Sequence, residues 1–243
     1  MKYGILITAR LKSKRLKKKI IRKINRHNLI TFLIKRLKQE FYNKNIVLIT
    51  SKSNQDKKLV DISIEEKINY FRGEPKDVLK RIYDASKKFK FNNVISCTAD
   101  NPFVDTKKAK KMMVHHMKKK NDLTIMKGLP IGLFSYALNI NAVKKVLNTK
   151  ASKDTETWGG YFTENKKLKV GFYKINLKIK NIDNIRLTVD VKQDLILIKK
   201  ILKISKNEYP TTYEILSIIR KHPSLLKINS NVKQKKVIKP KFK

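Results

Sequence analysis

The sequence predicts an α/β fold in which a mostly parallel sheet is flanked by helices. Short apolar runs suited to buried strands alternate with segments whose apolar residues recur at helical spacing. A length of 243 residues, 41% of them hydrophobic, is enough to bury one full core. These observations predict one principal domain.

The first half of the chain predicts four strands and two of the helices that connect them. The strands are Tyr3–Thr8, Ile46–Thr50, Ile68–Arg72 and Val94–Thr98. One helix is marked by apolar residues at helical spacing between the first two strands: Ile30, Leu33, Ile34, Leu37 and Phe41. Another follows the third strand, with Val78, Ile82, Ala85 and Phe89 at the same spacing.

The second half of the chain is less regular. Strands are expected at Leu123–Met126, Gly132–Leu138, Leu168–Ile175 and Arg186–Val189, some of them antiparallel. We expect a small strand-rich insertion around residues 123–140 that forms a homodimer contact. The reason is that its aromatic residues, Phe134 among them, would form an exposed patch that a monomer rarely leaves open.

The C-terminal part predicts one more helix and then a tail. Thr211 with Glu214 fits a capping box that starts a helix running to about Arg220. From Asn229 onward the chain is rich in Lys and poor in apolar residues. The predicted organisation is therefore a domain over residues 1–228 and a flexible basic tail over 229–243.

The charge of the chain raises the question of a nucleic-acid partner. The 59 Lys and Arg residues against 19 Asp and Glu residues give a formal charge of +40. Only nine of the 59 are Arg, and the lysines are spread over nearly every segment, whereas nucleic-acid-binding proteins gather charge on one face. We expect no nucleic-acid partner, and a basic nucleic-acid-binding protein stays the alternative from another functional class.

The cysteine count and the apolar runs bear on the compartment. Cys97 is the only cysteine, which excludes a disulfide within the chain and indicates no cysteine-based zinc site. The first residues run directly into a strand and lack the apolar region of a signal peptide. No apolar run approaches the roughly 20 residues that span a bilayer. We expect a reduced, cytoplasmic protein without a membrane span.

The loop after the first strand carries the strongest chemical signal. Arg10, Ser13, Arg15 and Lys19 follow the carboxyl end of Tyr3–Thr8, where ligands bind in open α/β sheets. Guanidinium, hydroxyl and ammonium donors suit a polyphosphate. A solvated basic turn is the plain alternative, and it is the reading we adopt for the other lysines of this loop.

Two aspartates follow predicted strands and could hold a metal. Asp100 comes directly after Val94–Thr98, and Asp190 directly after Arg186–Val189. Mg²⁺ takes one or two carboxylates together with substrate phosphate oxygens. The structural alternatives are an Asx turn for Asp100 and, for Asp190 with Gln193, a helix N-cap box. Asp105 is expected to be a helix N-cap.

A fourth segment, Phe71-Arg72-Gly73-Glu74-Pro75-Lys76-Asp77-Val78-Leu79-Lys80-Arg81, again follows a strand. Arg72 and Gly73 lie at the strand end, and Asp77 and Arg81 lie one helical turn apart on one face. These four residues are candidates for nucleotide or sugar contacts. The plain reading is a turn followed by an amphipathic helix.

Taken together and in order, these segments resemble the cytidylyltransferases that activate acidic sugars, in particular their spore-coat-polysaccharide branch. The first loop resembles R-x-x-S-x-R-L-P-G-K, with Lys17-Lys18 in place of Pro-Gly. The Asp100 segment resembles T-G/A-D-x-P-x-x-D, the Asp190 segment T-V-D-T-P-E-D-L, and the fourth segment F-R-G-x-x-x-D-V-L-x-R. The similarity runs from residue 2 to about residue 228.

The resemblance implies a fold, a reaction and a set of site residues. It implies a Rossmann-like sheet of the nucleotide-diphospho-sugar transferase type, and Mg²⁺-dependent transfer of CMP from CTP to a sugar acid with release of pyrophosphate. Arg10 and Lys19 would be catalytic, and Asp100 and Asp190 would bind Mg²⁺. The nucleotide-binding residues would be Ala9, Arg10, Ser13, Arg15, Lys19, Arg72, Gly73, Asp77 and Arg81. A nucleotidyltransferase with another nucleotide or a non-sugar acceptor is the alternative within enzymes.

Two further motifs have plainer readings. His115 and His116 are adjacent on a Lys-rich helix and do not share a face, which indicates a solvated pair rather than a metal site. The segment around Trp158 is interpreted either as a packing turn or as part of an acceptor pocket.

Overall fold

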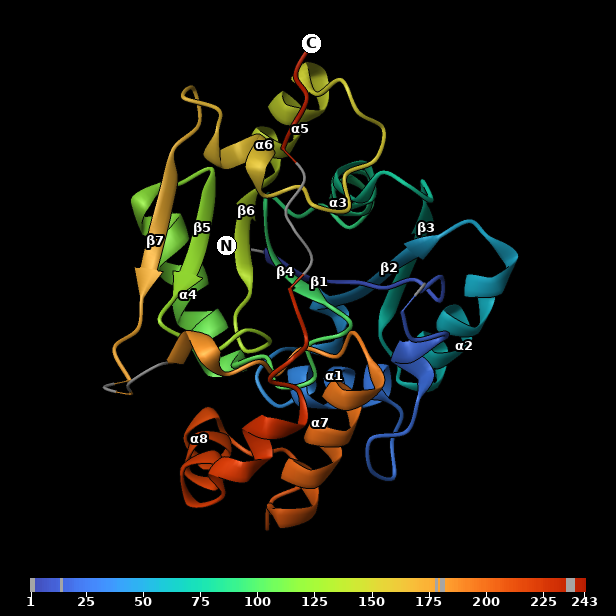
Figure 1. Cartoon of the computed structure of the whole chain (residues 1–243). Helices are drawn as coiled ribbons and strands as arrows, with labels where there is room; N and C mark the ends of the chain where they lie inside the picture. The colour runs from blue at the N-terminus through green and yellow to red at the C-terminus, as the bar shows by residue number, and fades with distance from the viewer. Residues whose placement is uncertain (1–2, 14, 178, 180–181, 235–238) are drawn as a thin grey trace.

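A computed structural model describes residues 3–13, 15–177, 179, 182–234 and 239–243. Within these residues, seven strands form one sheet in the order β3-β2-β1-β4-β6-β5-β7, with β3 and β7 at its edges (Figure 1). The strands are β1 (Tyr3–Thr8), β2 (Ile46–Ser51), β3 (Asn69–Gly73), β4 (Asn93–Thr98), β5 (Leu123–Lys127), β6 (Tyr136–Asn139) and β7 (Val170–Lys174). The sheet is mostly parallel, and only β6 runs antiparallel to both of its neighbours.

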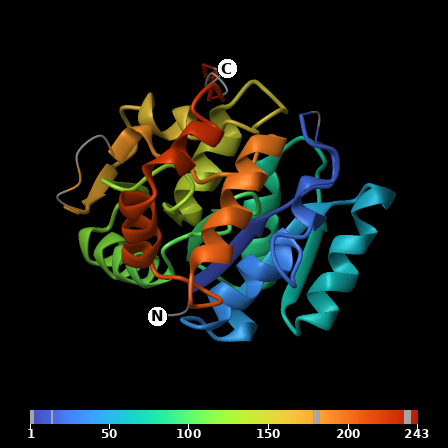
Figure 2. The ribbon, with the colours of Figure 1, turned by 60° about the horizontal axis from the view of Figure 1, so that its bottom comes forward.

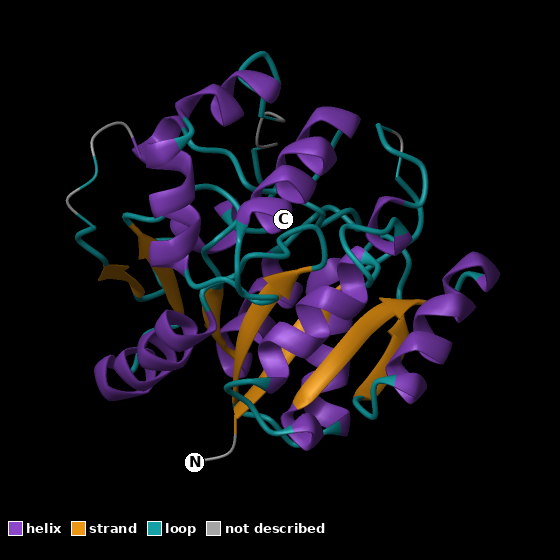
Figure 3. Ribbon diagram, turned by 90° about the horizontal axis from the view of Figure 1, so that it is seen from below, coloured by secondary structure: helices purple, strands orange, loops and turns teal. Residues whose placement is uncertain are grey.

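Helices lie on both faces of the sheet (Figure 3). They are α1 (Leu29–Lys38), α2 (Lys57–Glu65), α3 (Val78–Lys88), α4 (Thr106–Lys119), α5 (Ile140–Thr149), α6 (Gly160–Thr163), α7 (Lys192–Ile204) and α8 (Thr212–Lys221). Side chains of α1, α2, α4, α7 and α8 share one buried cluster, and those of α3, α5 and α6 share another. The helices α7 and α8 pack against each other (Figure 2).

The sheet separates these two clusters because successive strand residues point to opposite faces. In β1, Ile5 and Ile7 belong to the first cluster while Leu6 belongs to the second. In β2, Leu48 and Val47 divide in the same way. Both faces of these central strands are therefore buried, which explains why they read as continuous apolar runs.

The strand order reverses at β1, and in open α/β sheets such a reversal leaves a crevice at the carboxyl ends of the two strands beside it, here β1 and β4. The chain goes from β1 to β2 and β3 on one side and then returns to place β4 on the other side of β1. Ligands of open α/β sheets bind at this kind of reversal. The loops that follow β1 and β4 both start here.

The strand-rich segment at residues 123–140 is not a separate small insertion. Its strands β5 and β6 belong to the main sheet, where β6 pairs with β4. Phe134 and Tyr136 are half-buried against the two core clusters rather than exposed. A single chain leaves the expected homodimer a prediction, and the aromatic patch no longer argues for it.

Several smaller expectations changed. Arg186–Val189 is extended and forms one isolated bridge, between Ile131 and Arg186, instead of a strand. His116 is fully buried rather than solvated, and its Nδ1 lies 2.9 Å from Thr124 Oγ1. Trp158 is buried against the rings of Tyr136 and Phe162, as the packing interpretation expected.

Described residues of the predicted tail contact the rest of the chain at two places. The side chain of Asn229 is buried, and its Nδ2 donates to Asp194 Oδ1 at 2.9 Å. Near the end, Lys241 O accepts from Ala151 N at 2.8 Å, so the C-terminus lies beside α5 (Figure 1). Residues 235–238 of this tail lie outside the described residues, and the domain boundary at residue 228 stays a prediction.

No helix within the described residues is both long and apolar enough to cross a bilayer. Cys97 is buried in β4, and burial raises the pKa of its thiol to about 12. The thiol therefore stays protonated and acts as a core side chain.

Candidate active site

The loop after β1 is fixed to the sheet by its backbone and by two apolar anchors. Ala9 N donates to Ile49 O at 3.1 Å, and Leu11 N donates to Asp56 Oδ1 at 2.8 Å. Leu11 and Leu16 are buried in the core and anchor the described residues of this loop. Ser13 lies half-buried in this loop.

Lys18 shows how the loop turns without a glycine. Its φ of 53° lies in the left-handed region, and it precedes the short 3₁₀ helix Lys19–Ile21. A left-handed lysine costs roughly 1–2 kcal/mol relative to a relaxed backbone. This is the place where the sequence pattern has Lys17-Lys18 instead of Pro-Gly, and the turn forms with lysine in the strained position.

Lys19 brings together two loops that are remote in the sequence. Its Nζ donates to Asp100 Oδ2 at 2.7 Å and to Asp190 Oδ1 at 2.8 Å. Burial disfavours the charged amine, but the charges of Asp100 and Asp190 outweigh it and raise the pKa of Lys19 above its usual value. The ammonium therefore remains charged between two carboxylates.

Asp100 lies in the turn that ends β4. Asn101 N donates to Thr98 O at 3.1 Å, which closes the turn. Val189 N donates to Asp100 O at 2.9 Å, so the backbone before Asp190 is attached to this turn. The two aspartates are consequently presented side by side by two backbone segments that bond each other.

Asp190 is surrounded by cations. Arg15 Nη2 lies 2.8 Å from its Oδ1, and Arg186 Nη2 lies 2.7 Å from its Oδ2. Burial raises the pKa of this carboxyl, but the charge of Lys19 and the hydrogen bonds from Lys19 and Arg186 lower it further, so that the net pKa is below the usual value. Asp190 stays ionised well below neutral pH.

The N-cap interpretation of Asp190 with Gln193 is wrong. The helix α7 has Val191 at its N-cap position, and the Asp194 carboxylate accepts from Val191 N at 3.1 Å and from Asp190 N at 2.8 Å. Asp194, and not Asp190, therefore accepts hydrogen bonds from the backbone N–H groups at the start of α7. By contrast, Asp105 does cap α4, with Oδ1 accepting from Lys108 N at 2.9 Å, as expected.

Residues between β3 and α3 contact Arg10, at the start of the loop after β1. Arg10 Nη1 donates to Pro75 O, and its Nη2 lies 2.5 Å from Glu156 Oε1. Arg81 is buried and donates to Pro75 O at 3.0 Å. Burial, followed by the charge of Arg10, lowers the pKa of Arg81 to about 10.

The remaining candidates of this segment hold loops in place. Arg72 donates to the carbonyls of Ser51, Lys52 and Ser53. Asp77 caps α3 through Lys80 N at 3.0 Å and pairs with Lys150 Nζ at 2.6 Å. A Cβ on Gly73 would lie 2.8 Å from Phe71 Cε1 and 3.0 Å from Arg81 Cγ, so a larger residue there would require the Phe71 ring to shift.

The structure thus brings Arg15, Lys19, Asp100 and Asp190 into direct contact, and it places Arg10 and Arg81 together on the carbonyl of Pro75. The sequence interpretation missed Arg186, Asp194 and Glu156. An arginine inside an otherwise apolar extended segment, four residues before an aspartate, was a signal for Arg186. Glu156 offered no signal, because its partner Arg10 is 146 residues away.

The donor set around Lys19 fits a divalent cation that arrives with phosphate. Within the described residues, no three or more His, Cys, Asp and Glu side chains gather in a way that could hold a metal ion alone. Mg²⁺ takes one or two protein carboxylates when substrate phosphate oxygens complete its shell. The Lys19 ammonium marks the position between them.

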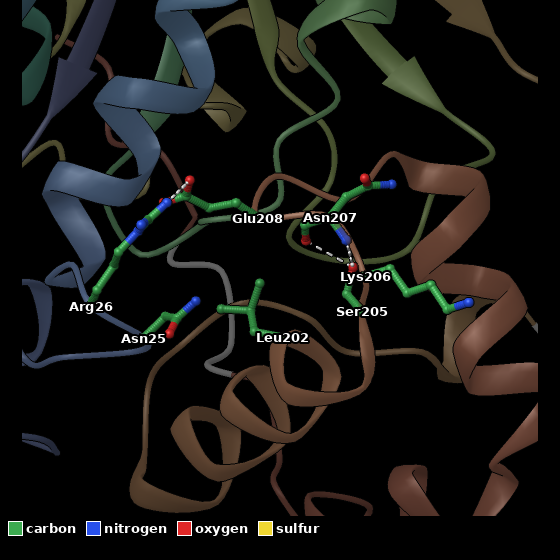
Figure 4. Close-up of a pocket in the computed structure, with 7 residues that line it drawn as sticks. All are labelled: Asn25, Arg26, Leu202, Ser205, Lys206, Asn207 and Glu208. Atoms are coloured by element: carbon green, nitrogen blue, oxygen red, sulfur yellow. Dashed lines mark hydrogen bonds and ion pairs between the residues drawn. The ribbon is translucent and has the colours of Figure 1, made fainter.

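A cavity of about 290 Å³ lies elsewhere, beside the end of α7 (Figure 4). Its wall includes Arg26 and Glu208, whose side chains pair with each other, and Lys206. Its lining residues all come from positions 25–26 and 202–208, so the candidate site residues do not belong to it. We assign the chemistry to the crevice between β1 and β4 because charged groups from three loops converge there.

Known proteins are similar to this chain in sequence. The family model described as cytidylyltransferase matches residues 4–235. An uncharacterized protein of Methanocaldococcus jannaschii is 31% identical over 236 residues, which cover 97% of each chain. The spore coat polysaccharide biosynthesis protein SpsF of Bacillus subtilis is 26% identical over 231 residues, 90% of this chain and 94% of that one.

Solved structures share the fold. A cytidylyltransferase from Leptospira borgpetersenii superposes with a TM-score of 0.86 and 23% identity, over 97% of this chain and all of that chain. A CMP:2-keto-3-deoxy-manno-octonic acid synthetase in complex with CTP superposes with a TM-score of 0.64 and 10% identity, over 84% of this chain and 99% of that chain.

Proposed function

Because this chain belongs to the cytidylyltransferase family, we propose that it transfers CMP from CTP to an acidic sugar, with release of pyrophosphate, for the synthesis of a surface polysaccharide or glycan. SpsF is named for spore coat polysaccharide biosynthesis, and the synthetase that shares the fold is named for a CMP-sugar acid and binds CTP. These names support the substrate classes. The observation that carries the proposal is the convergence of Lys19, Asp100 and Asp190 at the sheet reversal.

We assign the triphosphate to the loop after β1. Arg10 and Lys19 are the proposed catalytic cations, with Arg15, Ser13 and the backbone at Ala9 as further phosphate contacts. Preorganised positive groups aimed at developing negative charge are commonly the largest contribution in such transfers. The β3–α3 residues Arg72, Gly73, Asp77 and Arg81 are the proposed frame of the nucleotide pocket, because they hold the loops beside Arg10.

Asp100 and Asp190 are the proposed Mg²⁺ ligands. When bound, Mg²⁺ neutralises charge on the triphosphate and on the leaving pyrophosphate. The chain's own residues do the rest: the two carboxylates fix the position, and Lys19 and Arg15 supply donors to the phosphates. In the transfer, the acceptor oxygen forms a bond to the α-phosphorus, the bond from that phosphorus to pyrophosphate breaks, and pyrophosphate leaves with the bonding electron pair. The acceptor hydroxyl gives up its proton to water.

The proposal is tested by pyrophosphate release from CTP with a panel of sugar acids. CTP is expected to be used in preference to ATP, GTP and UTP. Equal turnover of all four nucleotides would leave a nucleotidyltransferase of another specificity. A protein that releases no pyrophosphate and binds nucleic acid with a steep salt dependence would instead be the nucleic-acid-binding alternative.

The metal ligands are tested by Asp190→Asn. Since Asp194 caps α7, the variant is expected to fold like the parent while its turnover falls by orders of magnitude, because a negative ligand is lost. Asp61→Asn, at an exposed position on α2, is the matched control and is expected to retain full turnover. Near-normal CTP turnover of Asp190→Asn with unchanged Mg²⁺ dependence would remove Asp190 from the metal site.

A further inference from the structure

We propose that Arg186 is a positioning residue for the Asp190 carboxylate, and that Asn229 and Gln234, from the segment after residue 228, hold Arg186 in place. The inference rests on the proposed function, because it concerns how the metal-binding carboxylate is oriented. It makes Asn229 and Gln234 components of the site.

Arg186 contacts both acidic residues at the start of α7. Its Nη2 donates to Asp190 Oδ2 at 2.7 Å, and its Nε donates to Asp194 Oδ1 at 3.1 Å. Arg186, Asp190 and Asp194 are 7%, 8% and 1% exposed, so the planar guanidinium is locked between two buried carboxylates. A planar fork of donors fixes two partners at once, which a single ammonium does not do.

Asp194 holds the backbone of Asp190, whereas Arg186 holds its side chain. Its Oδ2 accepts from Asp190 N at 2.8 Å, so the same carboxylate holds the backbone of Asp190 and the guanidinium that holds the side chain of Asp190. Asp190 is thereby restrained at its backbone N–H and at Oδ2. Its other carboxylate oxygen, Oδ1, contacts Lys19 and Arg15.

The C-terminal segment closes this arrangement. Asn229 is 4% exposed, and its Nδ2 donates to Arg186 O at 3.1 Å and to Asp194 Oδ1 at 2.9 Å. Gln234 Oε1 accepts from Arg186 Nη1. A buried amide that bonds two members of one ion-pair network has little freedom to serve any other role.

The three cations that contact Asp190 have different proposed roles, which follow from the segments that carry them. Lys19 and Arg15 lie on the loop after β1, which is the proposed phosphate loop, and their side chains are 14% and 40% exposed. They gain phosphate partners when CTP binds. Arg186 lies behind Asp190 on a different segment and keeps the carboxylate oriented while those contacts change. Residues that orient a metal ligand typically affect metal affinity 10- to 100-fold.

The inference is tested by Mn²⁺ binding in the presence of CTP, measured by electron paramagnetic resonance with no acceptor present. Arg186→Lys keeps the charge but supplies one point donor for two carboxylates, and Mn²⁺ is expected to bind at least about tenfold more weakly. Asn229→Ala is expected to weaken Mn²⁺ binding severalfold. This milder variant also carries the test if Arg186→Lys does not fold.

Two matched controls separate positioning from stability. Arg36→Lys removes another buried guanidinium, which donates to the carbonyls of Val104 and Pro210 at 2.8 Å, and should lower stability without changing Mn²⁺ affinity by more than about twofold. Ser230 is the exposed neighbour of Asn229, and its hydroxyl donates to Lys227 O. Ser230→Ala should leave both the stability and the Mn²⁺ affinity unchanged.

Asp190→Asn serves as the reference that distinguishes the two possible failures. If Asp190→Asn loses Mn²⁺ binding while Arg186→Lys and Asn229→Ala bind within about twofold of the parent, the positioning role is wrong and the proposed metal site stands. If Asp190→Asn itself binds Mn²⁺ like the parent, the metal site of the proposed function fails, and this inference fails with it.

Discussion

Three cations around one carboxylate give Asp190 its chemical character. Lys19, Arg15 and Arg186 approach it from two segments of the chain and keep its pKa below the usual value in spite of burial. An ionised, buried carboxylate is costly unless it is paired. The pairing therefore keeps the Asp190 carboxylate ionised to a lower pH than that of an ordinary aspartate.

His116 gives a pH-dependent stability that is separate from the site. It is fully buried, and burial lowers its pKa from 6.5 to about 4. Between these values the unfolded chain binds a proton that the folded chain does not, so the free energy of unfolding falls as pH drops from 6.5 to 4, by about 3 kcal/mol in total. Above pH 6.5 the residue has no such effect.

His116→Asn is expected to flatten this part of the stability profile, measured by urea unfolding at pH 7, 5.5 and 4.5. His115→Asn, at the half-buried neighbouring position, is the control and is expected to keep the parent slope. A parent whose stability is equal at pH 7 and 4.5 would contradict the assignment.

At the residue scale, the sequence predicted the charged residues that contact one another in the candidate site. It did not predict Arg186, which orients one of them. Arg15, Lys19 and Asp100 follow strands of the sheet, and the carboxyl ends of its central parallel strands converge. Asp190 was expected after a strand at Arg186–Val189. That segment is extended with one isolated bridge instead, and it reaches the site because Val189 N donates to Asp100 O. The role of Arg186 was not predicted, because two carboxylates and two side-chain amides contact it only in the folded chain.

At the element scale, the loop between β5 and β6 depends on Gly132. Its φ is +101°, and a Cβ there would lie 2.4 Å from the Leu187 carbonyl carbon. Leu187 N donates to Ile131 O at 2.7 Å, so this loop is attached to the segment that leads to Asp190. The close backbone approach is possible because glycine has no side chain.

Gly132→Ala is expected to lower the free energy of unfolding by about 2–4 kcal/mol, because it combines backbone strain with a clash that only backbone movement relieves. Gly159→Ala is the matched control, since nothing lies within 4 Å of its Cβ position, and its effect is expected to be under about 1 kcal/mol. Chemical denaturation measures both. Equal effects of the two substitutions would count against the role of the close approach.

The strands were predicted better than their surroundings. The first four agree to within one residue at either end, because buried parallel strands are continuous apolar runs. The strand predicted at Gly132–Leu138 is shorter in the structure, where β6 begins only at Tyr136 and ends at Asn139. The residues before it form the loop attached to Leu187, a tertiary contact that the local pattern does not contain.

At the scale of the whole molecule, the formal charge of +40 sets the response to salt. Self-repulsion of this size destabilises the compact state and is screened by added ions. The melting temperature is expected to rise by several degrees when sodium chloride increases from about 20 to about 300 mM. Calorimetry measures it, with glucose at equal osmolarity as the control, and a melting temperature that falls with salt would show that attractive ion pairs dominate.

The contacts that close the crevice have a consequence for how the protein is made. Lys19 and Asp190 are 171 residues apart, so the ribosome must produce most of the polypeptide before they can meet. Asp100 is only 81 residues from Lys19 and is made earlier. Until Asp190 follows, Lys19 and Arg15 lack that partner, and the nascent chain is exposed to polyanions in its surroundings, ribosomal RNA included. Translation thus produces the cationic loop early and Asp190 late, so the proposed metal site can be complete only near the end of synthesis.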